Sequence, residues 1–157
     1  MTEKEKDDIY YVCSLIEYIA RKTYNQRKTV IKYFSKKDID HQLYAAQVNH
    51  CLPFEQVSDE LIEEFGIQTG DYDSEAECRY SVPSVTSIGA VYQRLILDTS
   101  PNDPAQGILD VFSSFIAEEI SDFNSSTYYQ GAFFYEKSFL LLPCLFSILC
   151  VSILMPA

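Results

Sequence analysis

The 157-residue sequence has no tryptophan and few residues that break regular structure, with only five glycines and six prolines. This scarcity excludes collagen-like and linker-rich chains. The motifs GxxxxGK[ST], GxGxxG, GxSxG and HExxH are absent, so the common nucleotide-binding, hydrolase and zinc-protease classes have no support. The five cysteines include no CxxC pair, and the segment MTEKEKDD is charged where a secretory signal would be apolar. We therefore expect the main part of the chain to lie in the cytoplasm with its cysteines reduced, and the protein not to be secreted.

The composition otherwise indicates a folded domain with an aromatic interior. Apolar residues make up 47% of the chain, and twelve tyrosines and ten phenylalanines are among them. This content argues against wholesale disorder, and the length fits one domain. We expect a helical domain over residues 1–137, which is long enough for a core of its own, followed by an apolar tail over residues 138–157.

Apolar residues recur at spacings of three and four along most of the body, which predicts helices. Four local signals mark helix ends: Asp7 and Asp8 as caps, Ser35 with Asp38 as a capping box, Pro53 in a first turn and Gly66 as a left-handed cap. Residues 66–84 read as a loop between two helical halves, and residues 124–137 receive no assignment. The fold class is all-α: a single small domain of five to seven helices plus an apolar C-terminal helix. The expected helices cover residues 9–22, 26–34, 35–50, 53–65, 84–97 and 103–123.

Charge is unevenly distributed along the chain. Residues 1–37 carry a net charge of +4 and residues 38–157 carry −15, for a total of −11. The overall acidity opposes general nucleic-acid binding, because polyphosphate repels most of such a surface. Seven cations with no acid among them form a candidate interaction face: Arg21, Lys22, Arg27, Lys28, Lys32, Lys36 and Lys37.

This basic run has several interpretations. It can be a solvated face, or it can dock on the acidic part of the same chain. It can also contact phosphates, with a helix-turn-helix over residues 25–50, although the turn lacks the usual glycine. A fourth interpretation is contact with anionic lipid, at about 1 kcal/mol per cation close to the surface.

The last twenty residues, Ser138–Ala157, carry no charge. A helix of this length spans about 30 Å, which matches the hydrocarbon layer of a bilayer. Its eleven large apolar residues favour membrane entry by about 3 to 7 kcal/mol. The tail therefore predicts a membrane anchor, and two alternatives are a buried core helix and a segment added by a frameshift or read-through. The candidate membrane segment consists of Phe139, Leu140, Leu141, Leu142, Leu145, Phe146, Ile148, Leu149, Val151, Ile153 and Leu154.

No residue pattern predicts a reaction, a metal site or a cofactor. The two histidines, His41 and His50, lack the spacing to each other or to cysteines that zinc sites show. The acidic segment DYDSEAE lacks the glycine and the terminal glutamate of an EF-hand loop at the required offsets. A cysteine–histidine nucleophile pair stays open, because such pairs meet in space and not in sequence.

The segment LIEYIARKTYNQR, Leu15–Arg27, resembles the opening of small helical bacterial proteins of unknown function. The segments YQRLILD, Tyr92–Asp98, and FNSSTYY, Phe123–Tyr129, are similar to that group as well. Some members of the group are encoded beside ADP-ribosyltransferase-like toxins. We expect a non-enzymatic interaction module, antitoxin-like or regulatory, with the basic face or the acidic half of the chain as its contact surface. The resemblance implies that its partner is an operon-encoded toxin or another bacterial protein. The alternatives are a tail-anchored membrane accessory protein and a helix-turn-helix-like nucleic-acid binder.

Overall fold

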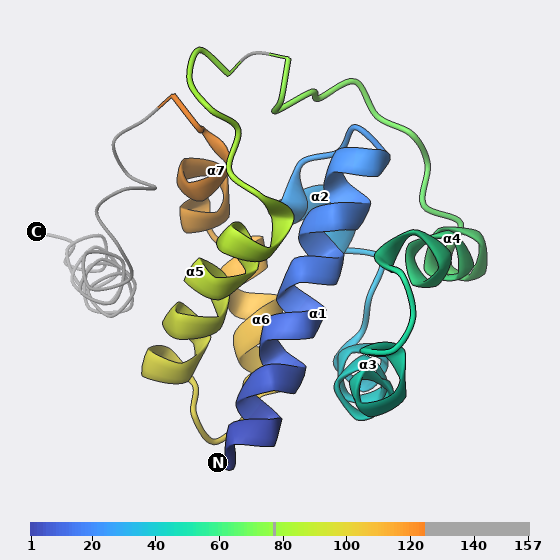
Figure 1. The fold of residues 1–157 in the computed structure, drawn as a ribbon, viewed down its shortest axis with the longest axis vertical. Coiled ribbons are helices and arrows are strands. Elements are labelled where there is room, and N and C mark those ends of the chain that lie inside the picture. Colours follow the sequence, from blue (N-terminus) through green and yellow to red (C-terminus); the bar gives the residue numbers. More distant parts are fainter. Residues whose placement is uncertain (77, 125–157) are drawn as a thin grey trace, which may run out of the picture.

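The structure is a computed structural model that describes residues 1–76 and 78–124, and within these residues the fold is all-α (Figure 1). The predicted fold class is confirmed for this part of the chain, whereas the predicted C-terminal helix lies outside the described residues. The described residues form seven helices: α1 Glu3–Lys22, α2 Arg27–Ile31, α3 Lys36–Asn49, α4 Phe54–Phe65, α5 Val85–Thr99, α6 Pro104–Ser113 and α7 Phe115–Ser121.

Helix α1 is the central element of the fold. It packs against α2, α3, α4 and α5, and Figure 1 shows α5 on one side of it with α3 and α4 on the other. Every residue from Asp8 to Ala20 except Tyr10 and Tyr18 is buried, so the helix is enclosed over most of its circumference. A helix buried in this way belongs to the centre of a domain and not to its surface.

Helices α1 and α5 come close together at Gly89, which packs directly against Ser14 of α1. A Cβ atom at Gly89 would lie 2.0 Å from Ser14 Oγ and 3.0 Å from Ser14 Cα. The Ser14 hydroxyl donates a hydrogen bond to the Tyr10 carbonyl at 2.8 Å, so it is held in this position. The glycine is therefore required by the close approach of two backbones.

Two of the four helix signals in the sequence are confirmed, and two are wrong. Pro53 is the extended N-cap residue of α4 and does not lie in its first turn. Ser35 and Asp38 form the predicted capping box, and Gly66 ends α4 with a φ of +62°. The first helix begins at Glu3, six residues before the predicted start, because Thr2 and Glu5 form a capping box of their own. Asp7 and Asp8 therefore lie within α1 and not at its cap.

The helix predicted over residues 103–123 is two helices. The chain is extended at Ser114, with φ −81° and ψ 167°, and the Ser114 hydroxyl accepts a hydrogen bond from the Ile116 N–H at 3.3 Å. The same hydroxyl donates to the Val111 carbonyl at 2.6 Å. Ser114 thus closes the end of α6 and caps the start of α7.

None of the helices described above is at once long enough and apolar enough to cross a membrane. The candidate membrane segment, Phe139 to Leu154, lies outside the described residues. The membrane anchor and its two alternatives therefore stay predictions.

Candidate functional site

A cluster of buried charges lies where α1 ends and the chain returns into α2. Glu17, with a side chain that is 0% exposed, accepts hydrogen bonds from Arg27 Nε at 2.6 Å and from Arg21 Nε at 2.7 Å. Glu17 and Arg21 are four residues apart on α1, a spacing that places them on one face. Arg27 reaches the same carboxylate from the first turn of α2, with a side chain that is 1% exposed.

Mutual attraction keeps this cluster ionised. Burial alone would raise the pKa of the Glu17 carboxyl, but the charges and hydrogen bonds of Arg27 and Arg21 outweigh burial and lower that pKa. Burial likewise opposes the charge of Arg27, and Glu17 outweighs it, so the pKa of the guanidinium is raised. Both groups therefore carry their full charge at neutral pH.

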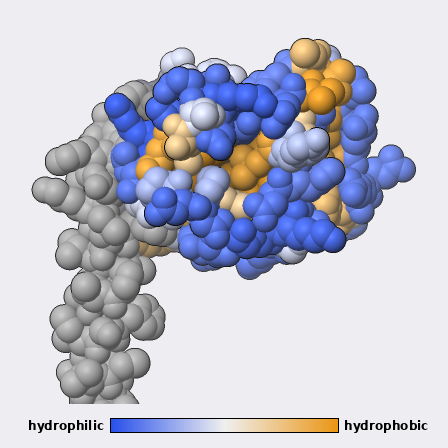
Figure 2. Space-filling view, turned by 90° about the horizontal axis from the view of Figure 1, so that it is seen from below, coloured by the Kyte–Doolittle hydropathy of each residue, from blue (hydrophilic) through white to orange (hydrophobic). Residues whose placement is uncertain are grey.

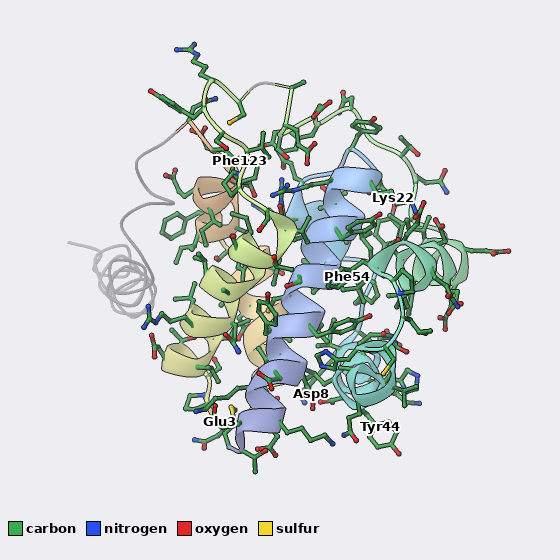
Figure 3. All side chains as sticks on the ribbon, in the orientation of Figure 1. Glu3, Asp8, Lys22, Tyr44, Phe54 and Phe123 are labelled. Carbon is green, nitrogen blue, oxygen red and sulfur yellow. The ribbon has the colours of Figure 1, made fainter. Side chains whose placement is uncertain are left out.

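The loop between α4 and α5 and the end of α7 close over the cluster. The Phe123 ring lies 5.1 Å from Arg21 Cζ and 5.7 Å from Arg27 Cζ, a stacked arrangement that Figure 3 places at the upper end of the molecule. Ser74 Oγ accepts from Arg27 Nη2 at 3.3 Å, and Glu75 accepts from Arg21 Nη1 at 3.0 Å. The two arginines thus join four separate parts of the chain.

Two nitrogen atoms of this cluster have no hydrogen-bond partner in the part of the chain that the structure describes. They are Nη1 of Arg27 and Nη2 of Arg21, and both atoms are buried. Buried donors without a partner are rare in folded proteins, because each loses its hydration without replacement. Arg27 also lines a small cavity of about 30 Å³.

Tyr72 lines two larger cavities near the cluster. Both cavities are lined by Asp71 and Tyr72. The first has a volume of about 390 Å³ and is also lined by Asp73 and Asp122. The second has a volume of about 380 Å³ and is also lined by Tyr24, Asn25 and Thr29. The 30 Å³ cavity shares Tyr72 with both. We call these three cavities together the Tyr72 hollow.

The backbone around the Tyr72 hollow is held in an unusual conformation. Tyr24 has a φ of +52°, which is a costly region for an aromatic residue. Its carbonyl accepts from the Tyr72 N–H at 2.8 Å, and the Thr23 carbonyl accepts from the Gly70 N–H at 2.8 Å. A Cβ atom at Gly70 would lie 2.5 Å from the Tyr24 carbonyl oxygen, so this contact also requires glycine.

The seven cations of the candidate interaction face do not share one surface. Arg21 and Arg27 lie in the buried cluster. Lys32 and Lys37 are exposed. The other three make ion pairs with the acidic part of the chain: Lys22 with Asp59 at 2.7 Å, Lys28 with Glu118 at 3.2 Å, and Lys36 with Asp103 at 3.1 Å and Asp40 at 3.2 Å.

A second surface feature is an apolar stripe on α3, which no pattern in the sequence had indicated. Tyr44 and Val48, four residues apart, are 74% and 70% exposed, and Leu52 just beyond the helix is 36% exposed. Figure 3 shows Tyr44 pointing outward at the lower edge of the molecule. Figure 2, a view from below, shows apolar surface surrounded by hydrophilic residues. We call Tyr44, Val48 and Leu52 the α3 stripe.

The histidines and cysteines among the described residues lie in different surroundings. His50 Nε2 lies 3.5 Å from Asp8 Oδ1, and the His50 ring packs 4.7 Å from the ring of Tyr11. His41 is exposed, Cys13 is buried and Cys51 is exposed. In residues 1–76 and 78–124 no three potential metal ligands of the His, Cys, Asp or Glu type come together.

Comparisons with known proteins add no relative. No protein-family model matches the chain, and neither a curated protein nor a solved structure does. The proposals below therefore depend on the geometry of the α3 stripe and of the Tyr72 hollow.

Proposed function

We propose that this protein is a non-enzymatic bacterial interaction module that inserts α3 into an apolar groove of another protein. The observation that supports the proposal is the exposure of Tyr44 and Val48 on one face of a well-capped helix. Side chains at positions i and i+4 form the usual anchor pattern of a helix that binds in a groove. Leu52 extends the same stripe beyond the end of the helix.

The partner is a different protein and not a second copy of this chain. A stable interface between two flat surfaces buries about 800 Å² on each side. The α3 stripe is one helix wide and contains three large apolar side chains, so two copies in contact would bury less than this. A groove that surrounds α3 gains additional area from its own walls.

The sequence resemblance directs the choice of the first partner to test. Similar small helical proteins are encoded beside toxins, so a protein encoded next to this one is the first candidate, in an antitoxin-like pairing. The ion pairs of Lys22, Lys28 and Lys36 within the chain favour α3 over the basic run as the contact surface.

The test is site-specific photo-crosslinking in the native host. A photoreactive phenylalanine analogue replaces Tyr44 in the full-length chain, and the adduct is identified by mass spectrometry. We expect one discrete adduct with a second protein. The substitution Val48→Ser should remove that adduct, because it takes away the neighbouring anchor.

Tyr80 and Val82 provide the matched control, because they are 64% and 37% exposed and lie on the loop before α5. The same analogue at position 80 should give no adduct with that partner. The proposal is wrong if position 44 gives no adduct, if it crosslinks only to another copy of this chain, or if position 80 captures the same partner equally well.

A further inference from the structure

We propose that the Tyr72 hollow binds an extended basic peptide segment of a protein, with one backbone carbonyl of that segment accepting a hydrogen bond from Arg27 Nη1. This binding site is separate from the α3 stripe. Figure 3 shows Phe123, beside the hollow, at the upper end of the molecule, whereas Tyr44 lies at the lower end.

The unpartnered nitrogen of Arg27 is the first observation. The side chain is 1% exposed, three of its contacts are made to Glu17 and Ser74, and Nη1 has no acceptor among residues 1–76 and 78–124. A buried guanidinium donor without an acceptor is unfavourable, because its hydration is lost without replacement. An acceptor that arrives with a ligand removes this cost, so the atom favours binding of a group with an oxygen lone pair.

The size of the small cavity limits what that group can be. The cavity lined by Arg27, Tyr72 and Ser121 measures about 30 Å³ and admits at least one group of the size of a water molecule. A carbonyl oxygen at the tip of a larger ligand fits this space. The rest of the ligand lies in the neighbouring cavities, and the aspartates that line those cavities disfavour a phosphate.

The two larger cavities give the ligand its shape. They measure about 390 and 380 Å³ and share Asp71 and Tyr72 as a common wall. Tyr72 lines both of them and also the small cavity. A chain that crosses Tyr72 would place one side chain in each large cavity and a peptide group above Arg27.

The charge of the ligand follows from the lining residues. Asp73 and Asp122 line one of the larger cavities and Asp71 lines both, with no lysine or arginine among the described residues that line them. The cations of the hollow, Arg27 and Lys28, line the small cavity, where they are paired with Glu17 and Glu118. Asp73 Oδ1 accepts the N–H groups of Glu75 and Ala76, which holds the carboxylate in place. With a net charge of −11 on the chain, the site attracts lysine and arginine side chains.

Both observations together select a peptide over a simple polycation. A polyamine satisfies the three aspartates but has no acceptor for Arg27 Nη1. An acidic peptide has the acceptor but is repelled by the aspartates. A basic peptide has the backbone carbonyl and the cationic side chains in one molecule.

The test uses the full-length protein and a fluorescent, end-blocked peptide of alternating glycine and lysine. Fluorescence anisotropy should show saturable binding. The double substitution Asp71→Asn/Asp122→Asn should weaken the binding at least about fivefold, because each lost carboxylate removes an attraction to the cationic peptide. The pair Asp98→Asn/Glu64→Gln removes the same charge from exposed positions on α5 and α4 and should change binding by less than about twofold.

A second measurement follows Arg27 without changing it. In nitrogen-15 NMR spectra, saturating lysine peptide should shift the Arg27 Nε–H signal and the backbone signals of Tyr72 and Ser74, whereas spermine should leave the Arg27 signal in place. The substitution Arg27→Lys retains the charge but removes Nη1. Circular dichroism shows whether this variant is folded, and the folded variant should bind the peptide less tightly than the unchanged chain.

Several outcomes would overturn the proposal. In one such outcome the peptide does not bind saturably and the Arg27 Nε–H signal does not shift, which would mean that the small cavity holds only water. Another is equal loss of binding in the two charge-matched double variants. A third is equally tight binding of the same peptide with glutamate in place of lysine, and a fourth is an equal response of the Arg27 signal to spermine.

Discussion

Glu17 carries a negative charge in the interior of the protein, and two arginines hold it there. Transfer of a charge from water into a protein interior costs several kcal/mol, and Arg21 and Arg27 offset that cost by hydrogen bonds and attraction. Loss of one partner in such a cluster leaves the others buried and unpaired. The arrangement is therefore far more sensitive to a change in one member than an exposed ion pair would be.

Glu17→Gln should lower the free energy of unfolding at neutral pH by about 3–5 kcal/mol, because both arginines lose their buried counter-charge. The pKa of Glu17 is lowered from its ordinary value of 4.5 in the folded protein. Its contribution to stability is therefore complete above about pH 4.5 and declines as the pH falls from 4.5 through the folded-state value. Urea denaturation between neutral and acidic pH should show a smaller loss of stability on acidification in the variant.

Asp38→Asn is the control for this experiment. The hydrogen bonds of Ser35 lower the pKa of Asp38, but this carboxyl lies at the surface, so the variant should lose much less stability at neutral pH. The interpretation of Glu17 is wrong if the stability of the Glu17→Gln chain falls with decreasing pH as steeply as that of the unchanged chain.

Helices α1 and α5 are the two longest helices that the structure describes, and their backbones come close together at Gly89. At Gly89 the nearest atoms include Ser14 Cα, which belongs to a backbone and cannot rotate away. A side chain at this position therefore forces the helices apart along their whole contact.

Gly89→Ala should destabilise the protein by about 1–3 kcal/mol, although alanine is the better helix former. Adding Ser14→Ala removes the hydroxyl at 2.0 Å but leaves Cα at 3.0 Å, so it should restore part of the loss. Thermal or urea unfolding of the single and double variants measures this coupling. Ala90→Gly, at the exposed neighbouring position, is the control for propensity alone. Equal or higher stability of Gly89→Ala would contradict the close contact.

Local signals predicted two of the helix ends, although the equally local Thr2–Glu5 capping box was missed. The Ser35–Asp38 box and Gly66 are confirmed, because each depends on atoms within a few residues. The break at Ser114 was not predictable, since the apolar pattern continues through it from Ile108 to Ile120 and serine is only a modest helix breaker.

The charge cluster depends on distant residues, and the sequence offered little to identify it. Arg27 is ten residues from Glu17, and Ser74 is a further 47 residues from Arg27. One available signal was Glu17 itself, a single acid on a face of α1 that is otherwise apolar, with Arg21 one turn later. The α3 stripe was also accessible only from the structure, because exposure of Tyr44 depends on which side of α3 faces α1.

At the scale of the whole molecule, the chain combines a net charge of −11 with ion pairs between its basic and acidic parts. Lys22, Lys28 and Lys36 make these pairs at the surface, where each contributes about 0–1 kcal/mol. The remaining acids repel one another, which destabilises the compact state. We expect this repulsion to outweigh the attraction within the ion pairs.

Raising the NaCl concentration from about 0.1 M to about 1 M shortens the screening length from about 10 Å to about 3 Å, so Tm should rise. The triple substitution Lys22→Gln/Lys28→Gln/Lys36→Gln removes three positive charges and takes the net charge from −11 to −14. Its Tm should be lower at low salt and should rise more steeply with NaCl. Calorimetry checks both curves, and a Tm that falls with NaCl in the unchanged chain would show that the ion pairs dominate.

The position of Cys13 has a consequence for how motion in this protein can be observed. Its thiol is fully enclosed on the central helix, and burial raises its pKa, so it stays protonated and unreactive. In a chain whose other four cysteines are replaced by serine, a thiol reagent would modify Cys13 only while the core is open. The labelling rate would then report how often the helices around α1 separate, under conditions in which nearly every molecule is folded.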